Sequence, residues 1–462
     1  ISNCSNPISP KPENPFKNIN LQILSDSTLA ITWQGEFESE ALLSLDRKVG
    51  EASWQMDYTN VPANDSIYVD TLYSVHTDTV YSYRLRFKES DNSSSISPSV
   101  ALLSERCVPV DFSARQIDKS TIRIAWRDQS IGEAGFRIDR QVGNDDWQIA
   151  YAKADSNSYE YFDITTTSSE ISYRIAAYAG SSFSSFTEIA KIKLGSLTLA
   201  NLYFGTEPTF EVMTWNIEEF PRFDTLTVSA VSQAIKALDI DIIGMQEIKS
   251  ATAFQQLLDS LGNWDGYRSN SARYDINLAF VYNPANITVN QYYEIFRNED
   301  AFPRPPLVIE LEWQNVPIIV INNHFKAMGD EDSQNRRLQA CTLLEEYIRT
   351  NLADDNVIVI GDLNDELTDA QSVNVFGPFL SQPSAYKFAD YSIAQGSSKY
   401  WSYPTWPSHI DHILITDELF GVFANSASVI KTLLIENYME GGWNEYAVKI
   451  SDHRPVALKL AF

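Results

Sequence analysis

The stretch Val357-Ile-Val-Ile-Gly-Asp-Leu-Asn364 decides the fold of the C-terminal half of this 462-residue chain. Its first four residues are apolar and predict a short buried strand, because a run of this length bounded by a turn signal is typical of a strand covered on both faces. Gly361 ends the run, and the polar residues Asp362 and Asn364 follow at once. The stretch therefore predicts a strand with functional side chains at its end.

The same pattern recurs on both sides of this stretch. The expected strands are 210–216, 240–246, 277–282, a pair within 307–322, 357–360, 410–415 and 455–462, and the expected helices are 231–238, 253–261 and 334–351. Mixed strands and helices with polar strand ends favour helices packed outside two sheets. We therefore predict a four-layer α/β sandwich, as a domain at 205–462.

Five motifs at these strand ends carry the candidate functional residues. They are MTWNI (213–217), DIIGMQE (241–247), INNHFK (321–326), VIGDLN (359–364), and IDH (410–412) together with SDHRP (451–455). In this order and spacing they resemble the endonuclease/exonuclease/phosphatase superfamily, whose best-known extracellular member is DNase I. The resemblance covers residues 210–462 and implies a DNase I-like fold with divalent-metal-dependent phosphodiesterase activity.

The resemblance also implies a metal site. Hydrolysis of a phosphodiester brings water against a negatively charged phosphorus, and a hard cation such as Mg²⁺ stabilises the charge that develops. Oxygen ligands suit that ion, and the motifs supply Asn216, Glu247 and Asp452. Mn²⁺ and Ca²⁺ remain alternatives to Mg²⁺.

The catalytic roles come from the same resemblance. Asp362 is expected to orient or deprotonate the attacking water, with Asn364 holding water or phosphate beside it. His453 is expected to pair with Asp411, which would fix its tautomer and raise its basicity. His324 is expected to donate a hydrogen bond to a phosphate oxygen or to protonate the leaving oxygen.

Two further histidines accompany Asp411 in the fifth motif. His409 and His412 are interpreted as supporting residues, and the two-residue alternation of a strand places His412 on the opposite face from Asp411. One position departs from DNase I: where its second histidine has a carboxylate partner, this chain has Ile276, with Asp275 one residue away. We therefore expect a single histidine–carboxylate pair.

The first two hundred residues contain an internal repeat with an offset of 93. Trp33 corresponds to Trp126, and both are expected to be core residues in short alternating strands. Repeated units of this size resemble fibronectin type III modules, which are β-sandwiches. We therefore predict two such domains, at 13–105 and 106–196, followed by a linker at 195–209. We expect these repeats to serve as spacers, with binding of a surface glycan or protein as the alternative.

Composition bears on location. No run of about 18 apolar residues exists, so no membrane-spanning helix is expected. The first residue is Ile, which removal of a signal peptide would explain, and a truncation or tag would look the same. A disulfide between Cys4 and Cys107 is one option in a secreted protein, and Cys341 is expected to be a buried thiol. The predicted location is secreted or at the cell surface.

Charge bears on the substrate. The net charge is −26, and residues from Gly205 onward contain 17 Lys and Arg against 35 Asp and Glu, a balance of −18. Non-specific binding of long nucleic acids depends on basic surfaces, so this balance favours small phosphoesters or lipid headgroups. Arg273 and Lys326 as phosphate contacts, and Trp406 as a stacking surface, favour an extracellular nuclease instead. A non-catalytic adhesion protein is the third hypothesis.

Overall fold

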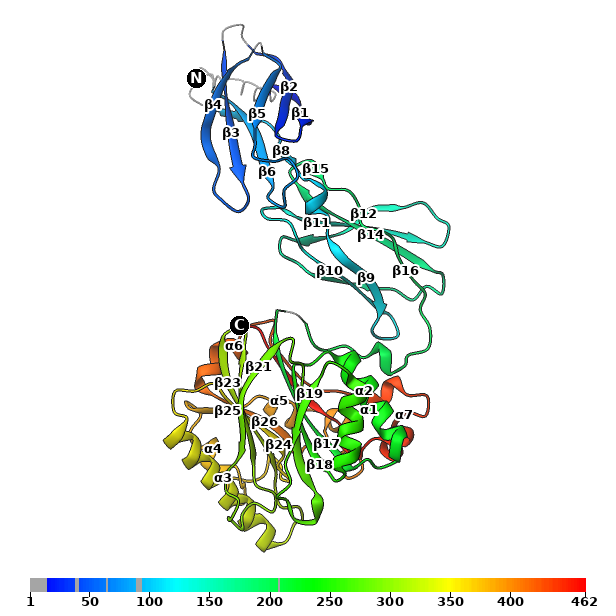
Figure 1. Cartoon of the computed structure of the whole chain (residues 1–462), viewed down its shortest axis with the longest axis vertical. Helices are drawn as coiled ribbons and strands as arrows, with labels where there is room; N and C mark the ends of the chain where they lie inside the picture. Colours follow the sequence, from blue (N-terminus) through cyan, green and yellow to red (C-terminus); the bar gives the residue numbers. More distant parts are fainter. Residues whose placement is uncertain (1–14, 38–40, 64, 89–93, 207) are drawn as a thin grey trace, which may run out of the picture. The chain divides into compact units, whose positions relative to one another are not determined.

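The computed structural model describes residues 15–37, 41–63, 65–88, 94–206 and 208–462 (Figure 1). The chain divides into two compact units, Ile1–Ser196 and Leu197–Phe462. The first unit is all-β, and the second combines strands with helices. The multidomain architecture expected from the sequence is therefore confirmed. No helix in the described ranges combines the length and apolarity needed to cross a bilayer.

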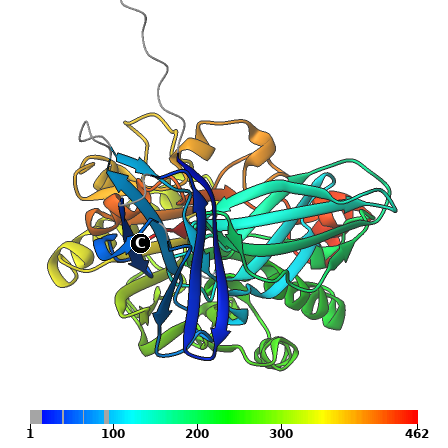
Figure 2. The ribbon, with the colours of Figure 1, turned by 90° about the horizontal axis from the view of Figure 1, so that it is seen from above.

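The first sandwich consists of two antiparallel sheets in the orders β1-β2-β5 and β4-β3-β6-β7, with β8 also paired to β6. Its strands are β1 (Phe16–Ser25), β2 (Thr28–Gly35), β3 (Leu42–Val49), β4 (Gln55–Pro62), β5 (Ile67–Thr71), β6 (Tyr81–Lys88), β7 (Ser94–Ile96) and β8 (Val100–Leu102). Figure 2 shows these strands in shades of blue.

The second sandwich repeats this arrangement, with sheets in the orders β13-β10-β9 and β12-β11-β14-β15 and with β16 paired to β14. Its strands are β9 (Val110–Gln116), β10 (Thr121–Arg127), β11 (Gly135–Val142), β12 (Gln148–Asp155), β13 (Glu160–Ile164), β14 (Ile171–Ala179), β15 (Ser182–Phe183) and β16 (Ala190–Ile192). The internal repeat of the sequence thus corresponds to a repeated fold.

A repeated polar cluster accounts for much of the sequence repeat. In each sandwich one buried aspartate accepts hydrogen bonds from two tyrosines and pairs with an arginine. The members are Arg47, Tyr58, Asp70 and Tyr83 in the first sandwich, and Arg140, Tyr151, Asp163 and Tyr173 in the second. A buried carboxylate is costly unless it is paired and hydrogen-bonded, which explains why all four residue types recur together.

The tryptophans and cysteines expected to be structural lie as follows. Trp33 and Trp126 are 3% and 4% exposed, so their prediction as core residues is confirmed. Cys341 is a buried thiol, as expected. Cys4 lies outside the described residues, so the disulfide between Cys4 and Cys107 stays a prediction. The Cys107 sulfur is buried 3.5 Å from the carbonyl oxygens of Thr77 and Asp78.

Two six-stranded sheets form the centre of the second unit, in the orders β19-β20-β18-β17-β28-β27 and β21-β22-β23-β24-β26-β25. The strands are β17 (Phe210–Phe220), β18 (Ile242–Ile248), β19 (Asp265–Arg268), β20 (Asn277–Tyr282), β21 (Ile287–Glu294), β22 (Leu307–Trp313), β23 (Val316–His324), β24 (Val357–Asp362), β25 (Tyr386–Phe388), β26 (Asp411–Thr416), β27 (Val429–Thr432) and β28 (Val456–Leu460).

Helices cover the outer face of each sheet (Figure 1), except the short helix at 420–423, whose side chains pack against the core between the sheets. The helices are α1 (Asp224–Leu238), α2 (Ala251–Leu261), α3 (Glu331–Asn351), α4 (Gly377–Leu380), α5 (Tyr391–Ala394), α6 (Phe420–Phe423) and α7 (Gly442–Lys449). One apolar core lies between the two sheets, and one lies between each sheet and its helices. The expected four-layer α/β sandwich is confirmed.

Part of the stretch expected to be a linker belongs to the second unit. Leu199, Leu202 and Phe204 are buried and pack in the core under α1. Gly205 donates its backbone N–H to the carbonyl oxygen of Leu238 at 2.7 Å. Three large apolar side chains within a segment rich in turn residues explain this difference, since their burial outweighs the turn signals.

Candidate active site

The ends of five strands bring the predicted site residues together. β17 runs parallel to β18, and β23 runs parallel to β24, so that the C-terminal ends of each pair lie at the same edge of their sheet. The register places His324 beside Asp362, and the antiparallel strand β26 places Asp411 on the other side of Asp362. Three of the motifs therefore meet in adjacent positions of one sheet.

Asn216 connects the two sheets at this edge. Its Nδ2 donates to Asp362 Oδ2 at 2.9 Å and to Glu247 Oε1 at 3.3 Å. The other Glu247 oxygen accepts from the backbone N–H of Glu219 at 3.0 Å. Glu247 has a left-handed backbone, with φ of 63°. Such a conformation is uncommon outside glycine and is found where the surrounding structure imposes it, often at functional sites.

A histidine–carboxylate pair lies beside Asp362. His453 Nδ1 lies 2.8 Å from Asp411 Oδ2, and both side chains are buried. Burial alone would favour the neutral imidazole, but the charge and hydrogen bond of Asp411 outweigh it and raise the pKa of His453 to about 10. The Tyr403 ring covers this imidazole, with ring centroids 4.7 Å apart. His453 is therefore a buried, positively charged group.

Asp362 lies at the centre of the cluster. Its Oδ2 is 3.4 Å from His324 Nε2 and 3.9 Å from His453 Nε2. Burial raises the pKa of Asp362 to about 7, with a further contribution from the negative charge of Asp411. A carboxyl group with a pKa near neutrality exchanges protons readily at physiological pH.

His324 differs from His453 in its surroundings. It is buried, and its Nδ1 has no hydrogen-bond partner among the described residues. Burial, the cation of Arg304 and the charge of His453 lower its pKa well below the usual value. Ile276 supplies no carboxylate to His324. His324 is therefore a neutral imidazole.

The remaining motif residues lie around this centre. Asn364 donates its backbone N–H to Asp362 Oδ1 at 3.1 Å and has a left-handed φ of 54°. Asp452 is partly exposed, and its Oδ1 lies 4.0 Å from His453 Nε2. Ser451 Oγ donates to the Asn216 carbonyl oxygen at 2.7 Å and accepts from the His453 N–H at 3.0 Å, which fixes the last motif against β17.

Two of the three predicted substrate contacts, Lys326 and Trp406, lie on loops, and Arg273 begins a short 3-10 helix (Arg273–Asp275). The Arg273 side chain is 77% exposed and lies 3.9 Å from Asp300. Lys326 Nζ donates to the carbonyl oxygen of Ala327 at 2.8 Å. Trp406 is 78% exposed, on a loop closed by the pairing of residues 403 and 408. The structure thus does not bring these side chains into the carboxylate cluster.

The sequence interpretation missed two residues of the site. Arg304 is partly buried and interacts electrostatically with Glu247 and Asp362, and its NH1 donates to the Phe325 carbonyl oxygen at 3.3 Å. The sequence feature that could have identified Arg304 is its position between prolines, directly before the strand β22. Glu218 accepts from the Asp452 N–H at 3.2 Å. It lies two residues after Asn216, so the strand alternation could have placed it on the same face.

The donor set fits a divalent cation. Glu218, Glu247, Asp362 and Asp452 gather carboxylates around Asn216, and the mutual repulsion of Asp362, Asp411 and Glu247 contributes to the raised pKa of Asp362. A cation would relieve this repulsion, and Mg²⁺ prefers such oxygen ligands. Asp362, Asp411 and His453 also present atoms within 4.8 Å of one another. In that group the His453 Nδ1 already bonds Asp411, so the carboxylates nearer the surface suit an ion better.

Two packed sheets with carboxylates and histidines at their strand ends are compatible with a hydrolase of phosphoester bonds. The profile of the Endonuclease/Exonuclease/phosphatase family matches residues 213–453, and the chain belongs to this family, which implies this activity. No curated protein matches the chain.

Solved structures with a similar fold include a humanized D. rerio TDP2, with 13% identity and a TM-score of 0.44 over 55% of this chain and 100% of the other. The human Nocturnin catalytic domain has 17% identity and a TM-score of 0.41 over 56% of this chain and 96% of the other. A mannosyl-6-phosphatase of Bacteroides thetaiotaomicron has 15% identity and a TM-score of 0.39 over 55% of this chain and 100% of the other.

Proposed function

We propose that the second unit is a secreted, Mg²⁺-dependent phosphodiesterase that cleaves DNA. The observation that carries the phosphodiesterase proposal is the arrangement around Asp362. A buried carboxyl group with a raised pKa lies within 4 Å of one charged and one neutral imidazole, and Asn216 connects it to Glu247. This arrangement supplies a proton acceptor and donors of hydrogen bonds to an anion.

In this proposal each side chain has a definite task. Asp362 accepts the proton of the attacking water, and Asn364 orients that water or a phosphate oxygen. His453, charged through its pairing with Asp411, stabilises the negative charge that develops on the phosphoryl oxygens. His324, as a neutral imidazole, donates from Nε2 to a phosphate or leaving oxygen. Removal of one such hydrogen-bond donor typically costs about 100- to 1,000-fold in rate.

Asn216, Glu247 and Asp452 would hold the metal ion, with Glu218 beside them. Mg²⁺ supplies, when bound, a Lewis acid that polarises the phosphoryl group. Mn²⁺ has the same preference for oxygen ligands, and Ca²⁺ shares it with a larger radius. The protein contributes the orientation: the Asn216 oxygen accepts from the Glu218 N–H at 3.1 Å, which fixes the amide against the carboxylates.

We assign substrate binding to basic side chains and one aromatic side chain. Arg304 interacts electrostatically with Glu247 and Asp362, and we propose that it binds a phosphate oxygen directly. Lys326 and Arg273 would contact flanking phosphates, and the exposed Trp406 would stack on a base. The ring is exposed on a short loop closed by the pairing of residues 403 and 408, which supports a role as a stacking surface.

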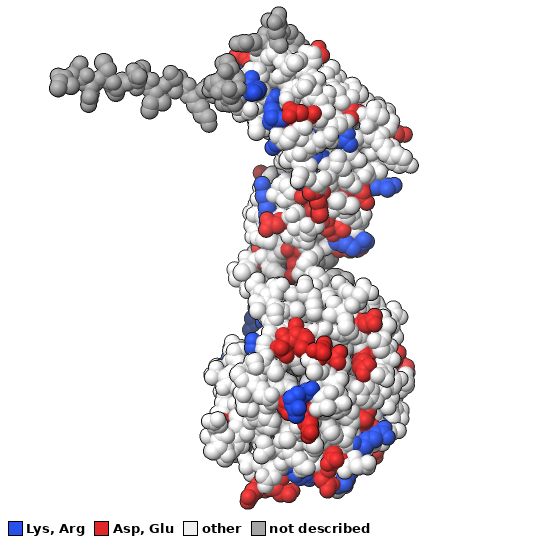
Figure 3. Space-filling view, turned by 90° about the vertical axis from the view of Figure 1, so that its left-hand side faces the viewer, with Lys and Arg blue, Asp and Glu red and all other residues white. Residues whose placement is uncertain are grey.

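The charge of the domain supports a second substrate class. Acidic side chains outnumber basic ones on the face of the second unit that Figure 3 shows in its lower half. Together with the balance of −18, this surface favours a small phosphoester or a lipid headgroup, because long polyanions gain affinity from basic surfaces.

A substrate panel distinguishes the two classes. The purified chain is incubated with supercoiled plasmid, bis-p-nitrophenyl phosphate and p-nitrophenyl phosphate, each with Mg²⁺ and with EDTA. Metal-dependent loss of supercoiled plasmid supports the nuclease. If the plasmid stays intact while the diester or monoester is hydrolysed, the substrate is a small phosphoester and not DNA. If no substrate is hydrolysed, the proposal that the protein is an enzyme is refuted.

For the N-terminal unit we propose two fibronectin type III-like domains, at 13–105 and 106–196, and a catalytic domain at 205–462. Their three-stranded and five-stranded sheets are compatible with that class. They would space the catalytic domain from a surface or bind a glycan or protein there. Under the adhesion hypothesis, Asp362→Ala leaves biological activity unchanged, whereas under our proposal it abolishes that activity.

A further inference from the structure

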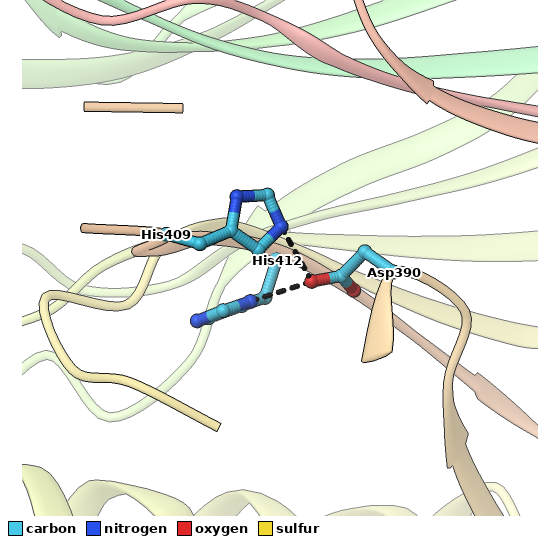
Figure 4. A group of neighbouring side chains, drawn as sticks. All are labelled: Asp390, His409 and His412. Atoms are coloured by element: carbon cyan, nitrogen blue, oxygen red, sulfur yellow. Dashed lines mark hydrogen bonds and ion pairs between the residues drawn. The ribbon is translucent and has the colours of Figure 1, made fainter. Parts of the chain in front are cut away.

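A second buried cluster lies beside the catalytic strand β26, on the opposite face from the site. It consists of Asp390, His409 and His412, all of them at most 2% exposed. Both imidazoles point to the same carboxylate oxygen (Figure 4). Asp390 Oδ2 is 3.1 Å from His409 Nε2 and 2.6 Å from His412 Nδ1. The side chains of Asp411 and His412 thus leave β26 in opposite directions.

Hydrogen bonds argue against a metal ion at this cluster, although its residue types suit one. His409 Nδ1 accepts from the backbone N–H of Ser402 at 3.2 Å. A neutral imidazole that accepts at Nδ1 carries its proton at Nε2, so Nε2 donates to Asp390 and has no lone pair for a metal. Asp390 Oδ1 is also occupied, since it accepts from the Ile413 N–H at 2.9 Å.

His412 has a different protonation state from His409. Its Nδ1 faces Asp390, and its Nε2 lies 2.9 Å from the carbonyl oxygen of Asp365. Both partners are acceptors, so both ring nitrogens must carry protons, and the side chain is an imidazolium. Burial opposes this charge, but Asp390 outweighs it and raises the pKa of His412. Asp390 and His412 therefore form a buried ion pair.

The carbonyl that His412 binds belongs to the catalytic loop. Asp365 follows Asn364 directly and comes three residues after Asp362. The carboxylate of Asp365 is held from the other side, since Arg337 Nε donates to its Oδ2 at 2.7 Å. Asp390, His412, Asp365 and Arg337 therefore form a buried row of alternating charges behind the loop.

Arg337 extends this row to the second catalytic loop. Its NH1 donates to the carbonyl oxygens of Lys326 and Met328 at 2.8 and 2.7 Å. The loop that it holds follows His324 directly. The same buried row therefore reaches the loops that carry Asp362 and His324.

We propose that His412 is a positioning residue that fixes the Asp362–Asp365 loop by donating from Nε2 to the Asp365 carbonyl, with Asp390 holding its ring in place. The role in catalysis rests on the phosphodiesterase function proposed above. Catalytic groups tolerate little displacement, and loss of a supporting hydrogen bond behind a metal site typically costs about 10- to 100-fold in activity.

Two substitutions separate this role from general stability. In His412→Gln the amide nitrogen takes the place of Nε2 and keeps the bond to Asp365, whereas in His412→Asn it takes the place of Nδ1 and keeps only the bond to Asp390. Both remove the charge. We expect His412→Asn to lower kcat about 10- to 100-fold with KM unchanged, and His412→Gln to stay within about 3-fold of the wild type. Equal losses in both variants, or none in His412→Asn, overturn the proposal.

Hydrogen exchange tests the positioning without any substrate. We expect the amides of Leu363 and Asn364 to exchange about 10-fold faster in His412→Asn than in the wild type and in His412→Gln. Unchanged exchange in His412→Asn overturns the proposal. If the wild type hydrolyses no phosphoester, the proposed phosphodiesterase function is rejected. The exchange rates still show whether His412 holds the loop.

The nitrogen signals of His412 give a third measurement. In ¹⁵N-labelled wild type at pH 7, two protonated ring nitrogens are expected for His412 and one for His409. A single protonated nitrogen on His412 overturns the assignment of both hydrogen bonds. His76, which is exposed on the first sandwich, provides the reference histidine.

Discussion

Nδ1 of His453 lies 2.8 Å from Oδ2 of Asp411, in a pair that joins the last motif of the chain to β26. Asp411 also accounts for the positive charge of His453, because its carboxylate raises the pKa of the buried imidazole to about 10. The two residues therefore act as one unit beside Asp362.

The first prediction concerns this pair. Asp411→Asn removes the negative charge, so His453 loses its proton near neutral pH and no longer stabilises the phosphoryl oxygens. We expect kcat for bis-p-nitrophenyl phosphate to fall by about 100-fold or more, with the fold intact by circular dichroism. Asp417→Asn, at an exposed position after the same strand, serves as the control. Activity within 3-fold of the wild type in Asp411→Asn would contradict the assignment.

The second prediction concerns the metal. Glu247→Gln keeps the size of the side chain but removes a charge from the expected ligand set. We expect the Mg²⁺ concentration for half-maximal activity to rise at least about 10-fold, because each ligand contributes strongly to affinity. Titration of activity with Mg²⁺, and of Mn²⁺ binding by electron paramagnetic resonance, measure this change. Glu418→Gln, an exposed carboxylate, should leave both curves unchanged.

The third prediction compares two arginines. Arg304 is partly buried and interacts electrostatically with Glu247 and Asp362, whereas Arg273 is exposed. We expect Arg304→Gln to lower kcat/KM about 10- to 100-fold, since a desolvated cation interacts more strongly with phosphate than a solvated one. Arg273→Gln should change kcat/KM by less than about 3-fold on a small diester. The reverse order would assign phosphate binding to the exposed side chain.

The sequence predicted the strand-end motifs well because each combines a clear apolar strand with a chemically unusual end. The helix at 334–351 and the strand at 357–360 lie where expected, within α3 and β24. The strands β19, β25 and β27 were missed because they are three or four residues long and lie at or near sheet edges, where apolar periodicity is weak. The eight-residue edge strand β21 was also missed, because most of its residues are at least partly exposed and it lacks a clear apolar pattern. The sequence could not order the strands within the sheets, since pairing depends on contacts far apart in the chain.

The candidate site, like the fold, was predicted from the sequence only in part. Asn216, Glu247, His324, Asp362, Asp411 and His453 were identified from motif chemistry, and the structure brings them together. Arg304 was missed because it belongs to no motif and reaches the site only through the turn before β22. The link from His412 to Asp365 was also missed, because His412 is adjacent to Asp411 and its partners lie elsewhere in the chain. Local patterns therefore predict the residues at strand ends but not the contacts that hold them.

The fourth prediction concerns stability at the opposite end of β17. Glu211 and Asp241 are buried together, and the Glu211 backbone N–H donates to Asp241 Oδ2 at 2.9 Å. Burial raises the pKa of Glu211 to about 9, with a further contribution from the Asp241 charge, and burial raises the pKa of Asp241 to about 6. Lys459 lies 3.9 Å from Glu211 and only partly offsets these effects.

Because the folded pKa values lie above the unfolded ones, the folded state retains protons that the unfolded state releases. The stabilisation is complete below about pH 4 and is lost as pH rises to about 9, at a slope of at most about 1.4 kcal/mol per pH unit for each group. We expect the melting temperature of the second unit to fall between pH 6 and pH 9. The Gln side chain of Glu211→Gln cannot ionise, so the melting temperature of this variant should fall less over this range. At pH 9 the variant should be more stable than the wild type. Glu312→Gln, at an exposed position of β22, should follow the wild type, and parallel curves for all three proteins would show that Glu211 is ionised in the folded state at neutral pH.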